Sequence, residues 1–486
     1  MIMATIITGK GQETVFSLSE IVSAVTGKEY SGPQLQFTEA AVDSRIAGNG
    51  MLFIAVPGEQ TDGHRFVPSA FANGAEAALV QEDMAGDFCM LDLRNGEVRG
   101  SVCAGKPLCI RVENTIDALQ KTAAFHRRTL PEMDVLGITG TVGKTTTKEL
   151  IFDILSRRFN TLKTLGNMNN EIGLPLTLLR ASAETEQAVL EMGFYVPGEI
   201  DQLCGIAAPS VGVITNVGMV HASRAGSMEV IAQGKSELVR ALPPEGTAIL
   251  NYDDPFVRPM ADVTDAKVFY YGLDPNADLY ADHVQSHGIR GLSFDLHYGG
   301  ETWELHTQMA GEHSVMTALR GAAVGLVKGV SREQITEALE NYRNQLRMRL
   351  TRTSGGAQMI DDTYNASPES TIAALNLIRE MDGRKIAVLG EMRELGQYEQ
   401  KGHEMVGRRA AACCDDLIAV GPVTRYIAEA AADAGMDRQR IHWFETVPEA
   451  AAFLKDGFGT AGQVLLIKGS RGMAMERIVS VLEEKK

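Results

Sequence analysis

The sequence predicts an α/β protein of about three domains, one of which carries a nucleotide-binding loop. Its 486 residues correspond to about three domains at a typical size of roughly 150 residues each. Apolar runs alternate with helical segments over most of the chain, and one run leads into the loop Gly140-Thr141-Val142-Gly143-Lys144-Thr145-Thr146, which is typical of a strand-to-helix turn. With 44% hydrophobic and 22% charged residues, the composition is that of an ordinary globular protein.

The negative net charge disfavours two classes of binding partner. Lys and Arg number 46 against 62 Asp and Glu, which gives a net charge of −16 and argues against a nucleic-acid coat or an anionic membrane surface. No apolar run approaches the roughly 20 residues of a membrane helix, and residues 1–16 lack the long apolar core of a signal peptide. We therefore expect a cytoplasmic protein that is not inserted in a membrane and binds no nucleic acid.

The six cysteines are few for this length, and none forms the closely spaced pairs of a zinc site. We therefore expect reduced thiols. Cys109 and Cys204 lie in apolar stretches, where a free cysteine is usually a packing residue.

The first block, residues 1–111, mixes short apolar runs with turn-rich segments. Strand candidates are residues 51–56, 75–80 and 107–112, and the segment PGEQTDGH after the first of them is typical of a turn. This pattern predicts a small α/β domain.

The second block, residues 112–345, predicts parallel β/α units. It begins with a helix around residues 115–127, followed by a strand candidate at 134–140, the glycine-rich loop and a helix over 144–159. Further strand candidates lie at 188–193, 211–217, 247–253 and 267–272, before a strand-rich passage to Leu305 and two helices at 316–329 and 331–344. Such alternation is the signature of a parallel sheet.

The third block, residues 346–486, predicts a second doubly wound sheet. Strand candidates at 358–362, 385–390, 416–421 and 463–469 alternate with helices that begin near Ser367, Glu399, Val423 and Met473. Ligands of such sheets bind at the carboxyl ends of the strands.

The glycine-rich loop carries the strongest chemical signal. Backbone amides of such a loop and the N-terminus of the next helix can hold phosphate. Lys144 can lie along the terminal phosphates, and the Thr145 hydroxyl can bind Mg²⁺, which favours oxygen ligands. The strict pattern has glycine at position 138, where this chain has Ile138, and the alternative is a glycine-rich turn with an incidental lysine.

Three polar residues further along are candidates for the same site. Glu191 ends one strand candidate and His221 follows another. Carboxylate suits Mg²⁺ better than imidazole, although either residue could simply cap or solvate a strand end. Lys235, judged from the residues alone, is one charged residue on a helix face. At about 4 Å and an effective dielectric of roughly 20, Mg²⁺ would repel an ammonium by about 8 kcal/mol. In a metal site Lys235 would therefore have to be neutral or converted to an anion.

In this order, the motifs resemble the Mur ligases, ATP-dependent amide-forming enzymes of peptidoglycan synthesis. The segments that carry the resemblance are AVDSR, FIAVPGEQTDGHRF, ITGTVGKTTTKE, GNMNNEIGLPLTLL, LEMGFYVPGEI, ITNVGMVH, GKSEL, DDTYNASPES, VLGEMRELG and IKGSRGM. The resemblance spans nearly the whole chain. It implies an N-terminal UDP-substrate-binding domain (1–111), a P-loop-type central ATP-binding domain (112–345) and a Rossmann-like C-terminal domain (346–486).

The resemblance also implies roles for individual residues. ATP would be bound by Gly140, Thr141, Gly143, Lys144, Thr145, Thr146, His313, Arg347 and Asp362. Two Mg²⁺ ions would be placed by Thr145, Glu191, His221 and Lys235, the last as a carbamate. The catalytic set would be Lys144, Glu191, His221 and Lys235. The substrate would meet Asp43, Ser44, Arg45, Asn169, Asn170, Tyr364, Asn365, Lys468 and Arg471.

The finer motifs imply an enzyme that joins D-alanyl-D-alanine to UDP-N-acetylmuramoyl-tripeptide through an acyl phosphate. We expect a monomer, although no motif indicates the oligomeric state. One departure concerns the adenine site. The family usually has two asparagines after its Gly-x-His, where Ser314 and Thr317 follow His313 in this chain. Hydroxyls have a shorter reach and no amide fork, so the contacts to the base are in question. Residues 92–106 receive no role.

Two alternatives stay open. One is a sister ligase, such as the diaminopimelate- or lysine-adding enzyme or a folylpolyglutamate synthetase, although the third block lacks the Asp-Asn-Pro-Arg acceptor motif of the amino-acid-adding enzyme. The other is a nucleotide-binding regulatory or scaffold protein without catalysis, which Ser314 and Thr317 would permit. The joint presence of Glu191, His221 and Lys235 disfavours it.

Overall fold

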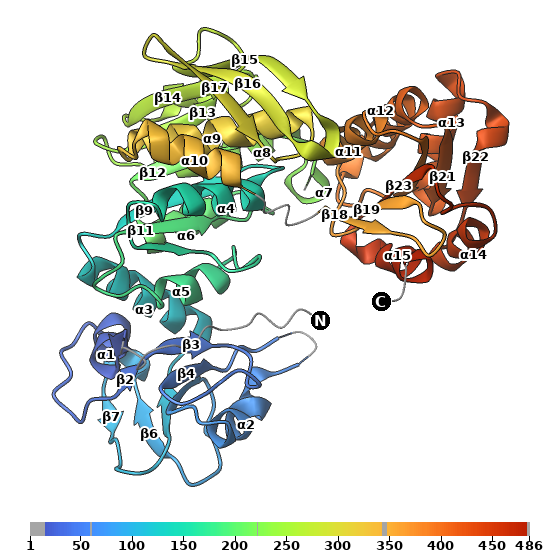
Figure 1. Cartoon of the computed structure of the whole chain (residues 1–486). Helices are drawn as coiled ribbons and strands as arrows, with labels where there is room; N and C mark the ends of the chain where they lie inside the picture. The colour runs from blue at the N-terminus through green and yellow to red at the C-terminus, as the bar shows by residue number, and fades with distance from the viewer. Residues whose placement is uncertain (1–14, 59–60, 221, 343–347, 484–486) are drawn as a thin grey trace. The chain divides into compact units, whose positions relative to one another are not determined.

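The computed structural model describes residues 15–58, 61–220, 222–342 and 348–483. The chain divides into two compact units (Figure 1). Met1–Val135, Asn160–Met192 and Gln202–Pro209 form the first, and Leu136–Phe159, Gly193–Asp201 and Ser210–Lys486 form the second. Both units combine helices with largely parallel sheets, so the predicted α/β class is confirmed. Over the described residues, no helix is both long and apolar enough to cross a membrane.

The first unit contains a six-stranded sheet from the N-terminal part of the chain. Its order is β3 (Glu39–Ala41), β4 (Met51–Ile54), β5 (Ala77–Val80), β8 (Leu108–Arg111), β6 (Cys89–Asp92) and β7 (Arg99–Gly100). All neighbours are parallel except β6 and β7. Helix α2 (Val67–Ala72) packs its two buried residues against β4, β5 and β8.

The rest of the first unit adds short strands and three helices. The strands are the antiparallel pair β1 (Phe16–Ser17) and β2 (Gln36–Phe37) and the parallel pair β10 (Thr161–Lys163) and β11 (Gln187–Glu191). Helix α3 (Thr115–Thr129) packs against both α1 (Leu18–Thr26) and α5 (Gly173–Leu178). Helix α6 (Glu199–Ala207) has residues in both units.

The second unit begins with a run of parallel strands. Their order is β9 (Asp134–Thr139), β12 (Val211–Ile214), β13 (Thr247–Asn251) and β14 (Lys267–Gly272). An antiparallel meander of β15 (Leu279–Ser286), β16 (Leu292–Tyr298) and β17 (Glu301–Thr307) continues this sheet. The helices are α4 (Lys144–Leu155), α7 (Ala222–Ala225), α8 (Met228–Arg240), α9 (Val315–Val327) and α10 (Arg332–Asn341). Helices α9 and α10 both pack on α4, the helix that follows the glycine-rich loop.

The second unit ends in a six-stranded sheet with helices on both faces (Figure 1). Its order is β18 (Arg349–Arg352), β19 (Gln358–Asp362), β23 (Gln463–Lys468), β20 (Arg384–Gly390), β21 (Asp416–Val420) and β22 (Ile441–Phe444), and only β18 is antiparallel. One face packs on α11 (Pro368–Arg379), α12 (Glu399–Cys413) and α13 (Arg425–Asp433), the other on α14 (Val447–Gly457) and α15 (Glu476–Leu482).

Alternating side chains of one strand supply both of these cores. Val464 and Leu466 of β23 belong to one core, whereas Leu465 and Ile467 belong to the other, because successive side chains of a strand point to opposite faces. The sequence therefore shows a continuous apolar run, as expected for a doubly wound sheet.

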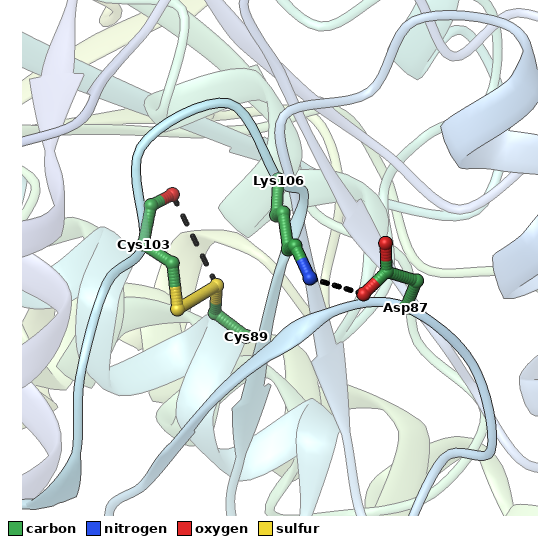
Figure 2. The surroundings of a disulfide bond; sticks show 4 residues. All are labelled: Asp87, Cys89, Cys103 and Lys106. Atoms are coloured by element: carbon green, nitrogen blue, oxygen red, sulfur yellow. Dashed lines mark hydrogen bonds and ion pairs between the residues drawn. A yellow bond between two sulfur atoms is a disulfide. The ribbon is translucent and has the colours of Figure 1, made fainter.

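The expectation of reduced thiols is wrong for one cysteine pair. Cys89, at the start of β6, and Cys103, in the loop before β8, form a disulfide with their Cα atoms 5.9 Å apart (Figure 2). Strand β6 lies parallel to β8 with Cys89 opposite Leu108, and the chain between them turns back through β7. This long-range strand pairing brings the two sulfur atoms together, and their spacing along the sequence does not reveal it.

An ion pair also links the loop before β8 to the chain at the start of β6. It joins Lys106 of the loop to Asp87 (Figure 2). The loop and the start of β6 are therefore linked by charge as well as by the disulfide. Cys109 and Cys204 are free and buried, as expected of packing residues.

Candidate active site

The glycine-rich loop lies in the second unit between β9 and α4. Strand β9 ends at Thr139, and α4 begins at Lys144. Gly140 has φ +144° and Gly143 has φ +85°, conformations that side-chain-bearing residues rarely adopt. A Cβ atom on Gly140 would also lie 1.8 Å from Oγ1 of Thr215. The path of the loop therefore requires glycine at position 140.

Two residues that follow β12 hold the loop in place. The N–H of Thr141 donates to the carbonyl of Asn216, and the N–H of Val142 donates to Asn216 Oδ1, both at 2.9 Å. Thr215 Oγ1 and Asn216 Nδ2 in turn donate to the carbonyl of Val142 at 2.8 and 3.0 Å. Because β12 is the neighbour of β9, the ITN segment lies beside the loop. Sequence reasoning missed both residues, although they stand inside the motif ITNVGMVH.

Lys144 folds back over the loop that precedes it. Its Nζ donates to the carbonyl oxygens of Gly140 at 2.7 Å and Thr141 at 3.1 Å. The ammonium therefore lies next to the N-terminus of α4, where the first backbone amides lack partners within the helix. Thr145 and Thr146 follow in the same first turn and are half-buried. A cation and the backbone amides at a helix start form an arrangement suited to phosphate.

Lys235 lies fully buried on helix α8. It shares one face of the helix with Ile231 and Leu238, at the i, i+4 and i+7 spacing of an apolar stripe. Within the part of the chain that the structure describes, its Nζ has no hydrogen-bond partner, and it lies 4.8 Å from the ring centroid of Phe194. Burial, and then the charge of Lys144, lower the pKa of Lys235 well below its ordinary value of 10.5. The side chain thus favours a neutral amine.

The first unit brings two of the candidate residues together. Glu191 is the last residue of β11 and is buried. Its Oε1 accepts a hydrogen bond from Asn169 Nδ2 at 2.9 Å, and its N–H donates to Thr164 Oγ1 at 3.0 Å. Asn170 has a local role, because its Oδ1 accepts from the N–H of Gly173 at 2.9 Å where α5 begins.

The candidates of the first block form a turn after β3. Arg45 donates from Nε to Asp43 Oδ1 at 2.9 Å and from Nη2 to Oδ2 at 2.5 Å. The hydrogen bonds from Arg45 are the first cause that lowers the pKa of Asp43. Ser44 is buried, and its carbonyl accepts from Asn73 Nδ2 at 2.8 Å. The exposed Arg45 guanidinium can exchange this partner at little cost, because ion pairs between exposed groups contribute little to stability.

A second cluster lies at the carboxyl ends of β19 and β23, where Asp362 stands opposite Lys468. Lys468 is buried, and its Nζ donates to Asp362 Oδ2 at 2.6 Å and to the carbonyl of Asn365 at 2.8 Å. Tyr364 and Arg471 are exposed beside these residues in the sequence. The doubly wound sheet therefore places candidate residues at the edge where such sheets bind ligands.

His313 and the two departures from the family pattern lie at the start of α9. Ser314 donates to a main-chain carbonyl at 2.7 Å, and Thr317 Oγ1 accepts from Arg320 Nη2 at 2.8 Å. His313 is accessible to solvent, yet protein surrounds it closely enough that desolvation, and then the charges of Arg320 and Lys468, lower its pKa to about 4. His221 and Arg347 lie outside the described residues.

Comparisons with known proteins agree with this architecture. Three family models match successive stretches: "Mur ligase family, catalytic domain" over residues 37–127, "Mur ligase middle domain" over 138–325, and "Mur ligase, glutamate ligase domain" over 346–471. The UDP-N-acetylmuramoyl-tripeptide–D-alanyl-D-alanine ligase of Bacillus subtilis is 33% identical over 480 residues, which cover 97% of this chain and 99% of that protein.

Solved structures extend the similarity. A crystal structure of MurF from Acinetobacter baumannii has a TM-score of 0.82 at 30% identity and covers 98% of this chain and 100% of that one. The MurF ligase of Thermotoga maritima in complex with ADP has a TM-score of 0.75 at 26% identity, covering 91% of this chain and 96% of that one. The chain therefore belongs to the Mur ligase family. Within that family it is of the MurF type, and the expected three-domain α/β architecture is confirmed.

Proposed function

We propose that the protein is an ATP-dependent ligase that joins D-alanyl-D-alanine to UDP-N-acetylmuramoyl-tripeptide and releases ADP and phosphate. The product would be the UDP-N-acetylmuramoyl-pentapeptide precursor of peptidoglycan. One observation carries the proposal: a glycine-rich loop with Lys144 folded over it stands in a chain that matches UDP-N-acetylmuramoyl-tripeptide–D-alanyl-D-alanine ligases over almost its whole length. We place the reaction in the cytoplasm and expect a monomer.

Each domain has its own part in this proposal. Residues 1–111 bind the UDP end of the substrate, residues 112–345 bind ATP, and residues 346–486 close over the reacting groups. Arg347 and Asp362 reach the nucleotide from the third domain, and His313 lies near its base. The turn of residues 43–45 faces the UDP end. The remaining substrate contacts are Asn169, Asn170, Tyr364, Asn365, Lys468 and Arg471.

The chemistry proceeds in two steps. A carboxylate oxygen of the tripeptide attacks the γ-phosphorus of ATP, the bond to the ADP oxygen breaks, and an acyl phosphate forms. The amine of D-alanyl-D-alanine then attacks the acyl carbon, and the tetrahedral intermediate expels phosphate after the amine loses a proton. Both attacks bring charged or electron-rich groups together, so the protein has to offset negative charge. Lys144 and the first amides of α4 supply that positive potential.

The donor set that the family resemblance implies suits Mg²⁺. The Thr145 hydroxyl, the Glu191 carboxylate, His221 and a carbamate on Lys235 would hold two ions, in keeping with the preference of Mg²⁺ for oxygen ligands. The orphaned, buried Nζ of Lys235 fits this assignment, because only a neutral amine adds carbon dioxide to form a carbamate. The bound ions would screen the charge of the phosphate oxygens.

The carbamate can be tested without an activity assay. Protein equilibrated with ¹³C-bicarbonate should show one carbamate resonance in its ¹³C NMR spectrum, and Lys235→Ala should lack it. Lys235→Ala should also be inactive and partly recovered by short carboxylates, which can take the place of the missing anion. Full activity of Lys235→Ala without any addition would contradict this role.

The acceptor distinguishes this function from that of a sister ligase. Purified protein is incubated with Mg-ATP and UDP-N-acetylmuramoyl-tripeptide together with D-alanyl-D-alanine, diaminopimelate, lysine or glutamate, and the products are weighed by mass spectrometry. We expect the pentapeptide product with the dipeptide alone. A product formed with a single amino acid would instead show the activity of a sister ligase.

A further inference from the structure

Arg320 is a buried cation without an anionic partner in the described part of the chain. It lies on α9 and is 4% exposed. Its Nε donates to Thr147 Oγ1 at 2.9 Å, and its Nη2 donates to Thr317 Oγ1 at 2.8 Å. Its Cζ lies 5.9 Å from the ring centroid of Tyr271. Each of these partners is neutral.

Such an arrangement is costly unless a ligand completes it. The guanidinium stays protonated in proteins, and a buried charge without a counter-charge costs several kcal/mol. Hydroxyl and ring contacts offset only part of that cost. A nearby anionic ligand would supply the missing compensation.

The position of Arg320 indicates which anionic ligand would compensate its charge. Its Nη2 lies 3.1 Å from the place that a Cβ atom of Gly143 would occupy, so the guanidinium lies close to the glycine-rich loop. Its other anchor, Thr147, lies on α4 less than one helical turn after Lys144. Arg320 therefore lies against the loop and the helix that together form the phosphate-binding element.

The titratable groups around the loop support this view. Desolvation first, and then the charges of Arg320 and Lys468, depress the pKa of His313 to about 4. These two cations disfavour a further positive charge near Arg320, as expected of a site with positive potential that accepts a polyanion.

We propose that Arg320 is a positioning residue of the nucleotide site, whose charge is compensated by the phosphate chain of the nucleotide held in the loop. This inference rests on the proposed function, since it takes the ligand of the loop to be ATP. Sequence motifs give no sign of it, because the residue acts from α9 on a loop that lies far away in the sequence.

The inference predicts that the contribution of Arg320 depends on the charge of the ligand. Affinities for ADP, ATP and adenosine are measured by isothermal titration calorimetry on the wild-type chain, Arg320→Met and Arg320→Lys. We expect Arg320→Met to weaken ADP and ATP binding by about 10- to 100-fold, as for a lost hydrogen bond to a charged group, and to leave adenosine unchanged. Arg320→Lys should recover part of the loss because it retains the charge.

Thermal unfolding separates this role from a structural one. Without nucleotide, Arg320→Met should unfold at the wild-type temperature or above it, because an uncompensated charge has been removed. With saturating ADP, its gain in unfolding temperature should be smaller than that of wild type. If Arg320 served only to link Thr147 to Thr317 in the fold, Arg320→Met would have a lower unfolding temperature without nucleotide and the same gain with ADP as wild type. This result would overturn the inference.

Arg384→Gln is the matched control. Arg384 also belongs to the second unit, but it already has a carboxylate partner, Asp416, at 2.6 Å. Its replacement should lower stability and leave ADP affinity unchanged. If the wild-type chain bound neither ADP nor ATP, the proposed function would fail as well. If it bound both and Arg320→Met bound them equally well, the inference about Arg320 alone would fail.

Discussion

Replacement of Lys235 by methionine should produce a more stable but inactive protein. Lys148 and Lys235 of the second unit are both fully buried. Lys148 has a carboxylate partner, with its Nζ 3.2 Å from Glu149 Oε1. Lys235 Nζ has no hydrogen-bond partner among the described residues. Lys235→Met removes an uncompensated polar group and retains an unbranched side chain of similar size, whereas Lys148→Met breaks a buried ion pair.

The structure sets the size of the two effects. A buried polar group without a hydrogen bond costs about 1–3 kcal/mol, and a neutral amine gains no cation–π energy from the nearby Phe194 ring. Lys235→Met should therefore raise the free energy of unfolding by at least about 1 kcal/mol at pH 7 in buffer free of carbon dioxide, where no carbamate forms. The control Lys148→Met should lower it by about 3 kcal/mol, because it leaves the Glu149 charge without that partner.

The pH dependence of the unfolding free energy tests independently whether buried Lys235 destabilises the folded chain. The pKa of Lys235 is depressed in the folded chain from 10.5, so between the two values the unfolded state binds one more proton. Wild-type stability should then rise relative to Lys235→Met by about 1.4 kcal/mol per pH unit within that window. The advantage of the variant should shrink as the pH rises toward 10.5.

Urea unfolding followed by tryptophan fluorescence measures these differences. The chain has two tryptophans, Trp303 and Trp443, and both report on the second unit. Midpoints are compared for wild type, Lys235→Met and Lys148→Met at pH 7 and pH 9. A urea midpoint for Lys235→Met below that of wild type at pH 7 would contradict the claim that Lys235 destabilises the folded chain. So would a difference between the two midpoints that does not shrink at pH 9.

Three further predictions concern the loop and the disulfide. Lys144→Ala should reduce ligation by at least about 100-fold, measured as product formed, while its unfolding curve stays within about 0.5 kcal/mol of wild type; full activity would exclude its role. Gly140→Ala should lower unfolding free energy by about 1–3 kcal/mol and weaken ADP binding in calorimetry, because its Cβ meets Thr215; wild-type values for both would contradict the loop geometry. Cys103→Ser opens a loop that spans 14 positions to Cys89 and should destabilise the first unit by about 3 kcal/mol, seen as faster amide exchange. Dithiothreitol should reproduce that loss in wild type and leave Cys103→Ser unaffected.

Local patterning was sufficient to predict the longer buried strands and most of the helices that follow them, but it missed short or half-buried elements such as β22 and helix α14. Apolar runs such as residues 463–469 became buried strands because each alternate side chain enters a core on one face of the sheet. Helix starts were less certain near the C-terminus. The last helix begins at Glu476 and not near Met473, since Arg471–Met473 forms a 3-10 turn.

The candidate site was only partly predictable, because several of its contacts cross between elements. Thr215 and Asn216 act on the loop from the next strand of the sheet, and Arg320 reaches it from α9. Cys89 and Cys103 meet through strand pairing. None of these contacts has a spacing that reveals it in the sequence.

Lys235 is a different case, because its signal was present in the sequence. Judged as one charge on a helix face, it suggested nothing unusual. Its i, i+4 and i+7 spacing with Ile231 and Leu238, however, places it on the buried face of α8. A lysine on an apolar stripe is a better indicator of chemistry than a lysine near a motif.

The measurement that tests the central claim most directly is phosphate release from Mg-ATP in the presence of UDP-N-acetylmuramoyl-tripeptide. It is run with D-alanyl-D-alanine, without it, and with single amino acids in its place. If the protein is this ligase, we expect steady phosphate release that requires the dipeptide, with one phosphate for each pentapeptide formed. Steady release that does not depend on the dipeptide, or no release with any acceptor, would contradict it.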